Sequence, residues 1–308
     1  MAEYTKLSPL DLQALVGKYN INGPVSVHPM EGGQANSSFK INTRDKAYIL
    51  SVCDEKNPRE IQTLVQILEH LRVHKFPTSR PLATRTGDKI ITHMGKPVYL
   101  KEFIPGQLKK NLDSAMVYHL GEGLKNLHQI PVPDQLPHGF PHGLTAFENF
   151  LNKNHPHPFS HWLKDQWEFL GSRLDPTMPK GLIHGDVFWD NLIFDGNKLK
   201  AILDFEEACH YYLIFDLAMA AVGTCSREGK FDFNKVEALL RGYGGPLSCH
   251  QGEQLGVFLV YAATAGAFWR FCQYNIHHPD PQKKESYKEL SPLADQIRSL
   301  AHYPWESI

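Results

Sequence analysis

Apolar and polar residues alternate in the first third of the chain, and apolar residues recur at helical spacing through most of the remainder. Short segments of period two are typical of half-buried strands, so we predict strands at 25–28, 38–42, 47–52, 89–93 and 98–103. Beyond residue 103 the apolar positions recur every three or four residues, which predicts helices. The pattern therefore predicts an α+β fold with two lobes, a strand-rich one at 1–103 and a mainly helical one at 104–308.

Capping signals give the beginnings of several predicted helices. Ser8 followed by Pro9 is expected to begin the first helix. Asn57 and Pro58 begin a second helix, in which Glu60 completes a capping box. Later helices are predicted at 113–128, 160–174, 215–222, 233–242, 252–274 and 285–302.

The composition is that of an ordinary globular protein. The chain has 308 residues, of which 42% are hydrophobic and 21% charged, and its formal net charge of −1 gives no sign of nucleic-acid binding. The N-terminal region lacks the apolar core of a signal peptide, and the apolar segment 256–269 is too short to span a bilayer. We therefore expect a cytoplasmic protein without a membrane partner, with 256–269 as a buried helix. Five cysteines without Cys-x-x-Cys spacing indicate neither a zinc site nor a disulfide framework.

Three oxygen-bearing side chains stand at the ends of apolar runs between residues 182 and 205. Asp186 follows a short apolar run and His-Gly, so we expect it where a buried strand gives way to a loop. Asn191 precedes one apolar run and Asp204 ends the next, and the Asp-Gly-Asn sequence between the runs favours a tight hairpin. Such a hairpin would bring Asn191 and Asp204 together at its open end.

These side chains fit phosphoryl transfer from ATP. The Asp186 carboxylate could receive the proton of an attacking hydroxyl. Asn191 and Asp204 offer the oxygen ligands that Mg²⁺ prefers, and Mg²⁺ would bridge the nucleotide phosphates. Singly, each residue would suit a structural role as a turn residue, a strand cap or a surface carboxylate. Together they favour a catalytic loop beside a metal-binding hairpin.

The sequence His184-Gly185-Asp186, followed by Asn191 and by Ile-Leu-Asp-Phe at 202–205, resembles the catalytic core of the aminoglycoside phosphotransferase and choline kinase superfamily. Its members are small-molecule relatives of the protein kinases. The resemblance implies a two-lobed, kinase-like fold, with ATP and Mg²⁺ as cofactors and a small-molecule hydroxyl as acceptor. It also implies catalysis by Asp186 and metal binding by Asn191 and Asp204.

Two segments of the first lobe are candidate nucleotide contacts. A Gly-rich turn between strands lets backbone N–H groups approach phosphate oxygens, which makes Gly32, Gly33 and Asn36 candidates. The superfamily has a Gly-x-x-Asn turn here, and this sequence matches it. By the same resemblance the last strand of the lobe leads into the hinge that pairs with adenine, so Glu102 and Ile104 are candidates too. A plain hairpin and a plain strand end are the structural alternatives.

Ser51 is the main departure from the superfamily pattern. Kinases have a lysine at this strand position that contacts the ATP phosphates, and a serine cannot supply its charge. Glu60, the usual ion-pair partner of that lysine, could then serve only as a capping residue. Either the chain is a non-catalytic kinase fold, or it belongs to a branch that works without the lysine. The bacterial type II homoserine kinases commonly have a short hydroxyl residue here, and the chain resembles them from about residue 32 to 274.

Candidate acceptor-binding residues follow from the chemistry of homoserine. This small zwitterion needs a cation for its carboxylate and an anion for its ammonium group. Arg270 could supply the first, and Glu206 or Glu207 the second. A surface arginine and a solvated turn are the alternatives. Asp216 lies among apolar residues, where an unpaired carboxylate is costly, so we expect it to accept backbone hydrogen bonds; the resemblance implies that it braces the catalytic loop.

The region 129–161 is rich in proline and histidine. Its histidines have no shared helix face on which to bind a metal, so we predict a loop that exposes them: His138, His142, His155, His157 and His161.

The predicted function is ATP- and Mg²⁺-dependent phosphorylation of a small-molecule hydroxyl, with L-homoserine as the favoured acceptor in threonine biosynthesis. An aminoglycoside, choline or another amino alcohol is an alternative acceptor. A nucleotide-binding pseudokinase, acting as a regulatory or interaction module, is the alternative from a different class. Retention of Asp186, Asn191 and Asp204 favours the enzyme.

Overall fold

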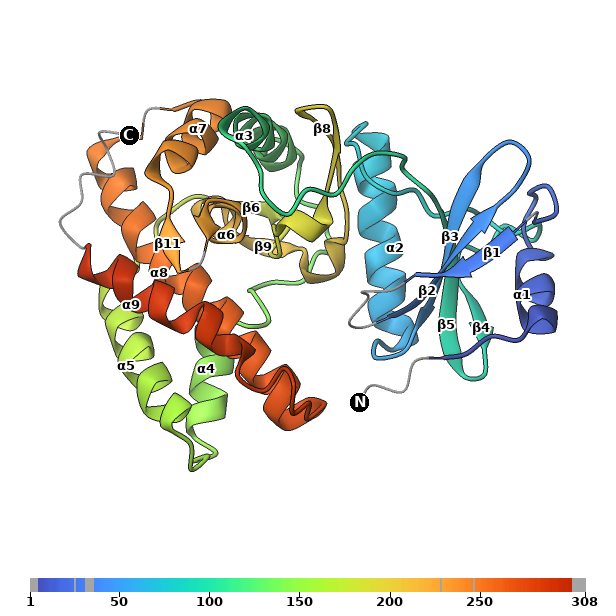
Figure 1. Cartoon of the computed structure of the whole chain (residues 1–308). Helices are drawn as coiled ribbons and strands as arrows, with labels where there is room; N and C mark the ends of the chain where they lie inside the picture. The colour runs from blue at the N-terminus through green and yellow to red at the C-terminus, as the bar shows by residue number, and fades with distance from the viewer. Residues whose placement is uncertain (1–4, 25, 31–35, 228, 246, 301–308) are drawn as a thin grey trace. The chain divides into compact units, whose positions relative to one another are not determined.

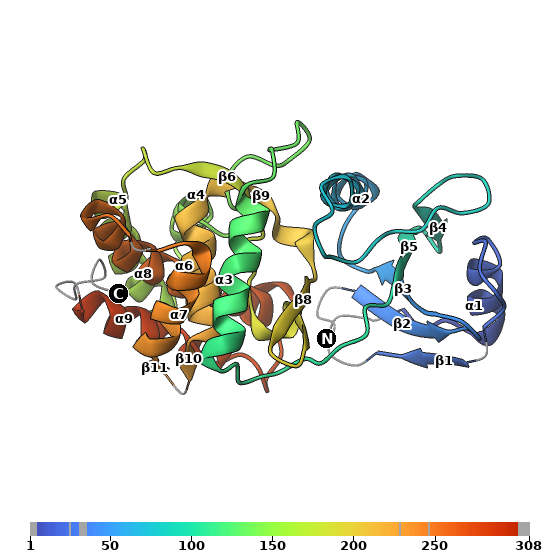
Figure 2. The same ribbon diagram turned by 90° about the horizontal axis from the view of Figure 1, so that it is seen from above.

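The computed structural model describes residues 5–24, 26–30, 36–227, 229–245 and 247–300. The chain forms two compact units, Met1–Pro105 and Gly106–Ile308 (Figures 1 and 2). This division lies two residues beyond the lobe boundary that the sequence predicts.

An antiparallel sheet of five strands, in the order β1-β2-β3-β5-β4, forms most of the first unit (Figure 1). Its strands are β1 (Ser26–Pro29), β2 (Asn36–Asn42), β3 (Ala47–Cys53), β4 (Ile91–His93) and β5 (Lys96–Glu102). The register places Ser51 of β3 opposite Ser38 of β2 and opposite Tyr99 of β5. Successive side chains along each strand point to opposite faces of this sheet.

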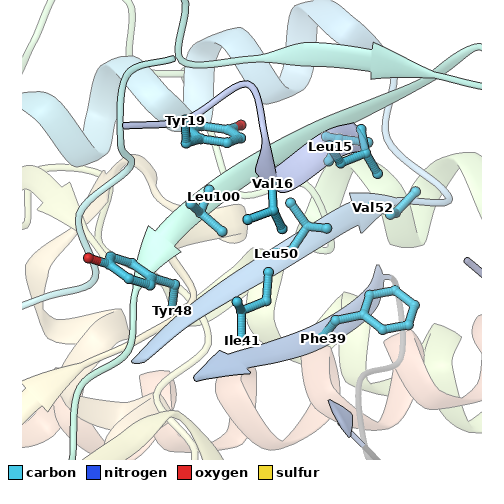
Figure 3. Packing of buried hydrophobic residues seen from close by; sticks show 10 residues of the cluster. Leu15, Val16, Tyr19, Phe39, Ile41, Tyr48, Leu50, Val52 and Leu100 are labelled. Atoms are coloured by element: carbon cyan, nitrogen blue, oxygen red, sulfur yellow. The ribbon is translucent and has the colours of Figure 1, made fainter. Parts of the chain in front are cut away.

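One face of the sheet is apolar and is covered by helix α1 (Pro9–Val16). Ser8 caps this helix, and Pro9 lies in its first turn, as predicted. Figure 3 shows how Leu15 and Val16 of α1 lie against the inward side chains of the central strands. Burial of this cluster is the main apolar contact between α1 and the sheet.

Helix α2 (Pro58–Val73) contacts strand β5 and buries an apolar stripe of its own. Its beginning is as predicted: the Asn57 side chain accepts hydrogen bonds from the first turn, and Glu60 Oε2 accepts one from the Asn57 amide at 2.8 Å. Glu60 is therefore a capping residue. This resolves the two interpretations that the sequence left open for it.

The second unit is mainly helical, as predicted (Figure 1). Its longer helices are α3 (Ser114–His128), α4 (Leu144–Leu151), α5 (Pro158–Arg173), α6 (Leu213–Thr224), α7 (Phe233–Tyr243), α8 (Cys249–Cys272) and α9 (Ser291–Ser299). Helix α8 contacts α5, α6 and α9, so it lies at the centre of the packing. Most of its side chains are buried.

Helix α8 begins three residues before the predicted helix 252–274. The helical segment Cys249–His277 is, by length and composition alone, long and apolar enough to cross a membrane, so the expectation of too short a segment, made from 256–269, is wrong. Polar residues at both ends of the apolar stretch continue the helix. Most of its apolar part is nevertheless buried inside the unit, which confirms the prediction of a buried helix.

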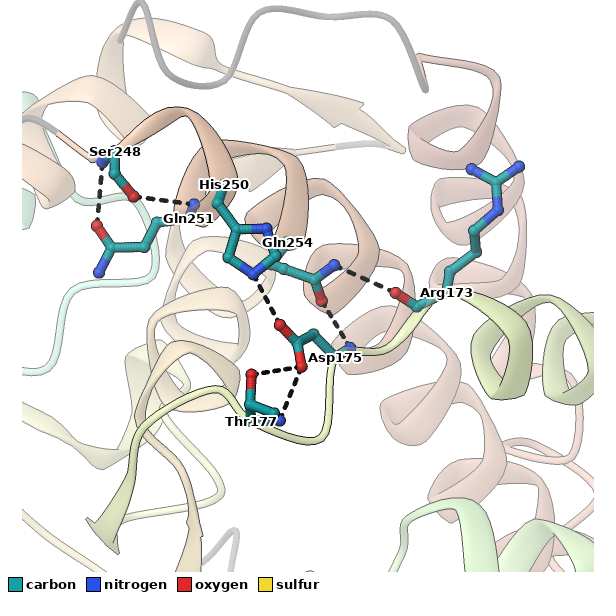
Figure 4. A network of polar contacts seen from close by, with 7 residues as sticks. All are labelled: Arg173, Asp175, Thr177, Ser248, His250, Gln251 and Gln254. Carbon is teal, nitrogen blue, oxygen red and sulfur yellow. Dashed lines mark hydrogen bonds and ion pairs between the residues drawn. The ribbon is translucent and has the colours of Figure 1, made fainter.

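Hydrogen bonds hold the beginning of α8 to the segment that follows α5 (Figure 4). The side chain of Gln254 accepts from the Asp175 amide at 3.0 Å and donates to the Arg173 carbonyl at 3.2 Å. His250 Nε2 lies 2.7 Å from Asp175 Oδ2. These contacts fix the segment that leads into the next strand, β6.

Three two-stranded sheets complete the described part of the second unit. They are formed by β6 (Lys180–Ile183) with β9 (Cys209–Tyr212), by β7 (Leu192–Asp195) with β8 (Lys198–Ile202), and by β10 (Ser226–Arg227) with β11 (Lys230–Phe231). The β7–β8 hairpin confirms the prediction made from Asp-Gly-Asn. Strand β9 was not predicted, because its four residues have no clear alternation and its partner β6 is distant in the sequence.

The prediction of a plain loop at 129–161 is wrong in two respects. The region contains helix α4, whose Phe147 and Phe150 are buried, and α5 already begins at Pro158. Among its histidines, His155 stacks on Phe150 with ring centroids 4.8 Å apart, and the His157 ring accepts from an amide at the start of α5. Helix α4 was missed because the aromatic side chains that stabilise it find their partners only in the folded unit.

The last predicted helix, 285–302, is interrupted. A short 3₁₀ helix, η4 (Ser286–Glu289), precedes α9. Pro292 lies in the first turn of α9, where a proline is tolerated because its missing N–H would have no partner within the helix. The proline thus marks the beginning of a second helix where the apolar pattern alone predicts one.

Candidate active site

The catalytic-loop candidate follows strand β6 directly. His184 is fully buried, and its Nε2 donates to the carbonyl of Leu203 at 2.7 Å. Its Nδ1 accepts from the amide of Asp186 at 3.1 Å. These two bonds use both ring nitrogens and define the neutral tautomer. The histidine thus ties Asp186 to the end of the β7–β8 hairpin.

Gly185 occupies a position that favours glycine. Its φ is +85°, in the region that side chains rarely adopt, and a Cβ there would lie 2.7 Å from the carbonyl oxygen of Glu207. The backbone can therefore pass close to the residues that follow Asp204. This is a physical reason for glycine between His184 and Asp186.

Asp216 holds the same loop from α6. Its Oδ2 accepts from the His184 amide at 2.9 Å, and its Oδ1 accepts from the Gly185 amide at 2.8 Å. His128 Nε2 on α3 lies 3.1 Å from Oδ2. Burial would raise the pKa of Asp216, but the hydrogen bond and charge of His128 hold that pKa below its ordinary value. The carboxylate therefore remains ionised in an apolar surrounding.

The hairpin brings Asn191 to Asp186. Asn191 Nδ2 donates to the backbone carbonyl of Asp186 at 2.9 Å and to its Oδ2 at 3.1 Å. The amide of Leu203 donates to the Asn191 carbonyl at 2.8 Å. This bond joins the two strands of the hairpin directly before Asp204. Asp204 is exposed and has a left-handed conformation, with φ 63°. The structure thus brings together the ends of the three predicted segments.

Burial and neighbouring negative charges raise the pKa of two aspartates at this site. Burial raises the pKa of Asp186 to about 7, with contributions from the negative charges of Asp204, Glu207 and Asp190, while the hydrogen bond from Asn191 opposes the shift. The pKa of Asp190 is also raised, first by burial, then by the charge of Asp204; the Arg270 charge opposes this. Among the described residues, three further carboxylates therefore act on the Asp186 side chain.

These residues fit a divalent cation. Asn191 uses its Nδ2 to bind Asp186, so its Oδ1 is the atom that could bind a metal. The exposed carboxylate of Asp204 adds a second hard oxygen ligand. A cation held by these two residues would also offset the charge that raises the pKa of Asp186.

The acceptor candidates lie in two different surroundings. Glu206 and Glu207 belong to the 3₁₀ helix η2 (Phe205–Glu207), directly after Asp204, and His142 Nε2 lies 3.4 Å from Glu207 Oε2. Arg270 is half-buried and donates to Glu289 at 2.6 Å and to the Ser286 carbonyl at 3.2 Å. Its charge still acts on Asp190, so the structure brings it within electrostatic reach of the catalytic loop.

Two residues at the site were not found from the sequence. Asp190 directly precedes Asn191 and adds to the charge on Asp186, and its position in the loop is a signal that could have identified it. His142 reaches Glu207 from the Pro- and His-rich region, and only the fold shows this.

The nucleotide candidates belong to the first unit. Gly32 and Gly33 lie outside the described residues, whereas Asn36 begins β2. Glu102 ends β5, and its amide donates to the Arg80 carbonyl at 3.0 Å, so a ligand would have to use its carbonyl group. Ile104 lies two residues after Glu102 and is half-buried. Their roles toward a nucleotide stay predictions.

The fold and the ordered set of Asp186, Asn191 and Asp204 define a kinase-like phosphotransferase. The pattern of the phosphotransferase enzyme family matches residues 26–251, and the chain belongs to this family. It is thus a phosphotransferase of the superfamily whose catalytic core its sequence resembles.

Curated relatives cover most of the chain. It is 31% identical over 254 residues to a homoserine kinase of Caulobacter sp., covering 79% of each chain. It is 28% identical over 280 residues to the homoserine kinase of Caulobacter vibrioides, covering 85% of this chain and 86% of the relative. The matched segments extend well beyond the catalytic core.

Solved structures confirm the predicted fold. A microcompartment-associated aminopropanol kinase superposes with a TM-score of 0.73 at 16% identity, covering 97% of this chain and 100% of that one. A spectinomycin phosphotransferase in complex with ADP and spectinomycin superposes with a TM-score of 0.69 at 15% identity, covering 98% and 100%. At these identities the likeness concerns the fold alone.

Proposed function

We propose that the protein transfers the γ-phosphoryl group of ATP to the hydroxyl of L-homoserine, giving O-phospho-L-homoserine and ADP. The observation that carries the transfer chemistry is the contact of Asn191 with both the backbone and the carboxylate of Asp186, beside Asp204. The curated relatives named homoserine kinase support the choice of acceptor. This product would place the reaction in threonine biosynthesis, and we propose a cytoplasmic location for it.

Asp186 would act on the acceptor hydroxyl. As the hydroxyl oxygen forms its bond to the γ-phosphorus, the bond from that phosphorus to the bridging oxygen of ADP breaks, and the hydroxyl proton passes to the Asp186 carboxylate. The hydrogen bond from Asn191 fixes the direction of this carboxylate. Alcohol hydroxyls have a high pKa, so Asp186 accepts the proton late and contributes mainly by orienting the attack.

Asn191 and Asp204 would hold Mg²⁺ on the nucleotide phosphates. When bound, the ion supplies positive charge that neutralises the charge developing on the transferred group. The β7–β8 hairpin and the left-handed backbone conformation of Asp204 determine where the two side chains leave the main chain, which supports this assignment.

The acceptor would bind between opposite charges. Glu207 or Glu206 would bind its ammonium group, and Arg270 would bind its carboxylate. Arg270 is already paired with Glu289, but the Glu289 side chain is largely exposed, and such a surface pair contributes only about 0–1 kcal/mol. A ligand carboxylate could therefore replace Glu289 at modest cost.

A steady-state screen of ATP consumption tests the proposal. Homoserine, choline, an aminoglycoside and 1-amino-2-propanol are offered separately with Mg²⁺, and ³¹P NMR identifies the product. We expect turnover with homoserine and its loss in Asp186→Asn. Turnover only with another acceptor would show that homoserine is not the substrate, while the assignment as a kinase would stand. Absence of turnover with every acceptor would favour the pseudokinase alternative.

A further inference from the structure

Two lysines lie on the same face of the first unit's sheet as Ser51. Strand β3 places Ile49 two residues from Ser51, and the register pairs Ile49 with Lys40 on β2 and with Lys101 on β5. Side chains two residues apart on a strand share a face. The apolar side chains of Leu50 and its neighbours point the other way, into the cluster of Figure 3. Both lysines are therefore on the face from which a lysine at position 51 would project.

The ammonium groups of the two lysines lie in different places. Lys40 Nζ is 3.8 Å from the ring centroid of Phe103, beyond the end of β5. Lys101 Nζ instead lies 3.5 Å from the hydroxyl of Tyr99 and 5.4 Å from its ring centroid. Tyr99 is the residue directly opposite Ser51, and such opposed Cβ atoms are roughly 5 Å apart. The Lys101 ammonium group thus lies beside the side chain of Tyr99, the residue that pairs with Ser51.

The surroundings of this ammonium group are polar but partly shielded from water. Ser51 and Tyr99 are each 1% exposed, and Ser38 Oγ lies 3.5 Å from Ser51 Oγ. Lys101 itself is half-buried. A charge in such a position is less screened than one on the open surface, so it attracts an anionic ligand more strongly.

The acidic residues of α2 are engaged elsewhere. Glu60 binds the Asn57 amide, and Glu69 lies 2.6 Å from Lys89 and 3.0 Å from Arg72. These contacts differ from the lysine–glutamate pair that the family resemblance implies.

We propose that Lys101 supplies the positive charge for the ATP phosphates that Ser51 cannot supply. This inference rests on the proposed function, because it takes ATP as the phosphoryl donor. It assigns to strand β5 a contact that the resemblance would place on β3.

Calorimetric titration with adenylyl imidodiphosphate and with adenosine, both with Mg²⁺, tests the assignment. Lys101→Met keeps most of the length of the side chain and removes its charge. We expect it to weaken binding of the nucleotide analogue by about 10- to 100-fold, as for loss of a hydrogen bond to a charged group, while adenosine binding changes little. Lys40→Met is the matched control on the same face and should leave the ratio of the two affinities unchanged. Lys101→Arg should keep most of the affinity for the analogue.

A second pair of measurements separates charge from folding. Thermal unfolding shows whether each variant is folded, and the double variant Ser51→Lys with Lys101→Met should regain part of the phosphate-dependent affinity. Unchanged analogue binding in folded Lys101→Met would overturn this inference, and so would an equal loss of affinity for adenosine. Either result would leave the proposed use of ATP in place. If the wild-type protein does not prefer the analogue to adenosine, both the inference and the proposed use of ATP are wrong.

Discussion

The amide of Gly185 donates a 2.8 Å hydrogen bond to Oδ1 of Asp216, which joins the catalytic loop to a helix that begins at Leu213. The other carboxylate oxygen of Asp216 accepts from the His184 amide and from His128. Both oxygens of one buried carboxylate are thus used to hold the backbone that precedes Asp186. The position of the Asp186 carboxylate therefore depends on a residue of another element, helix α6.

We predict that Asp216→Asn lowers both stability and activity. The amide NH₂ would replace one acceptor and face a backbone donor, so the free energy of unfolding should fall by about 2–4 kcal/mol. A shift of the loop should lower kcat by about 100-fold. Urea unfolding and steady-state kinetics measure the two effects.

Glu122→Gln, which breaks an exposed pair with His119, is the control and should change stability by less than about 1 kcal/mol. An unchanged kcat in folded Asp216→Asn would contradict the bracing role.

Gly185→Ala should be far more damaging than Gly196→Ala. Both glycines have positive φ, at +85° and +58°, so both substitutions introduce backbone strain of about 1–2 kcal/mol. Only at Gly185 would the new Cβ meet a backbone atom, the Glu207 oxygen at 2.7 Å; at Gly196 nothing lies within 4 Å. The first variant should lose most activity and additional stability, and the second should remain active. Thermal unfolding together with kcat compares them, and equal effects would show that steric contact is unimportant.

Local signals explain which parts of the fold could be predicted from the sequence. The β7–β8 hairpin and the start of α2 depend on residues that are neighbours in the chain, such as Asn57 and Glu60. Asp186 and Asn191 are five residues apart, so their contact is also local. Turn and cap chemistry was sufficient in each case.

Contacts between distant segments could not be predicted in this way. Strand β9 exists because Cys209–Tyr212 pairs with β6, and its own sequence has no strand pattern. The pairing of Arg270 with Glu289 depends on how α8 and η4 pack. Likewise, the placement of Lys101 on the same face of the sheet as Ser51 follows from the β3–β5 register, for which the sequence has no local signal.

Asp54 should make the stability of the first unit depend on pH. Its side chain is 6% exposed and accepts from Lys96, Ser37 and Thr5, each at 2.6 Å. Burial opposes ionisation, but these hydrogen bonds hold the pKa of Asp54 below its ordinary value. Since the unfolded pKa is about 3.9, the stabilisation is fully present above about pH 5 and is lost as pH falls through the folded pKa.

Comparison of the wild-type protein with Asp54→Asn checks this dependence. The variant should be less stable by about 1 kcal/mol near neutral pH, and the difference should shrink below about pH 4. Urea unfolding from pH 3 to 7 measures it. Asp45→Asn, at an exposed carboxylate, is the control and should show no such trend. A difference that grows as pH falls would have the wrong sign for a lowered pKa.

Asp204→Ala should reduce turnover at least as much as Asp186→Ala. Loss of a general base costs about 10²- to 10⁴-fold, and removing a metal ligand here would leave the phosphate charge without its main counterion. Because Ser51 replaces the usual lysine, the metal and the proposed Lys101 contact together have to balance this charge. The measurement is kcat at saturating ATP over a range of Mg²⁺ concentrations, with Asp195→Ala on the same hairpin as an exposed carboxylate control. Asp204→Ala should also need more Mg²⁺. A mild Asp204→Ala effect beside a severe Asp186→Ala effect would mean that the metal is bound elsewhere.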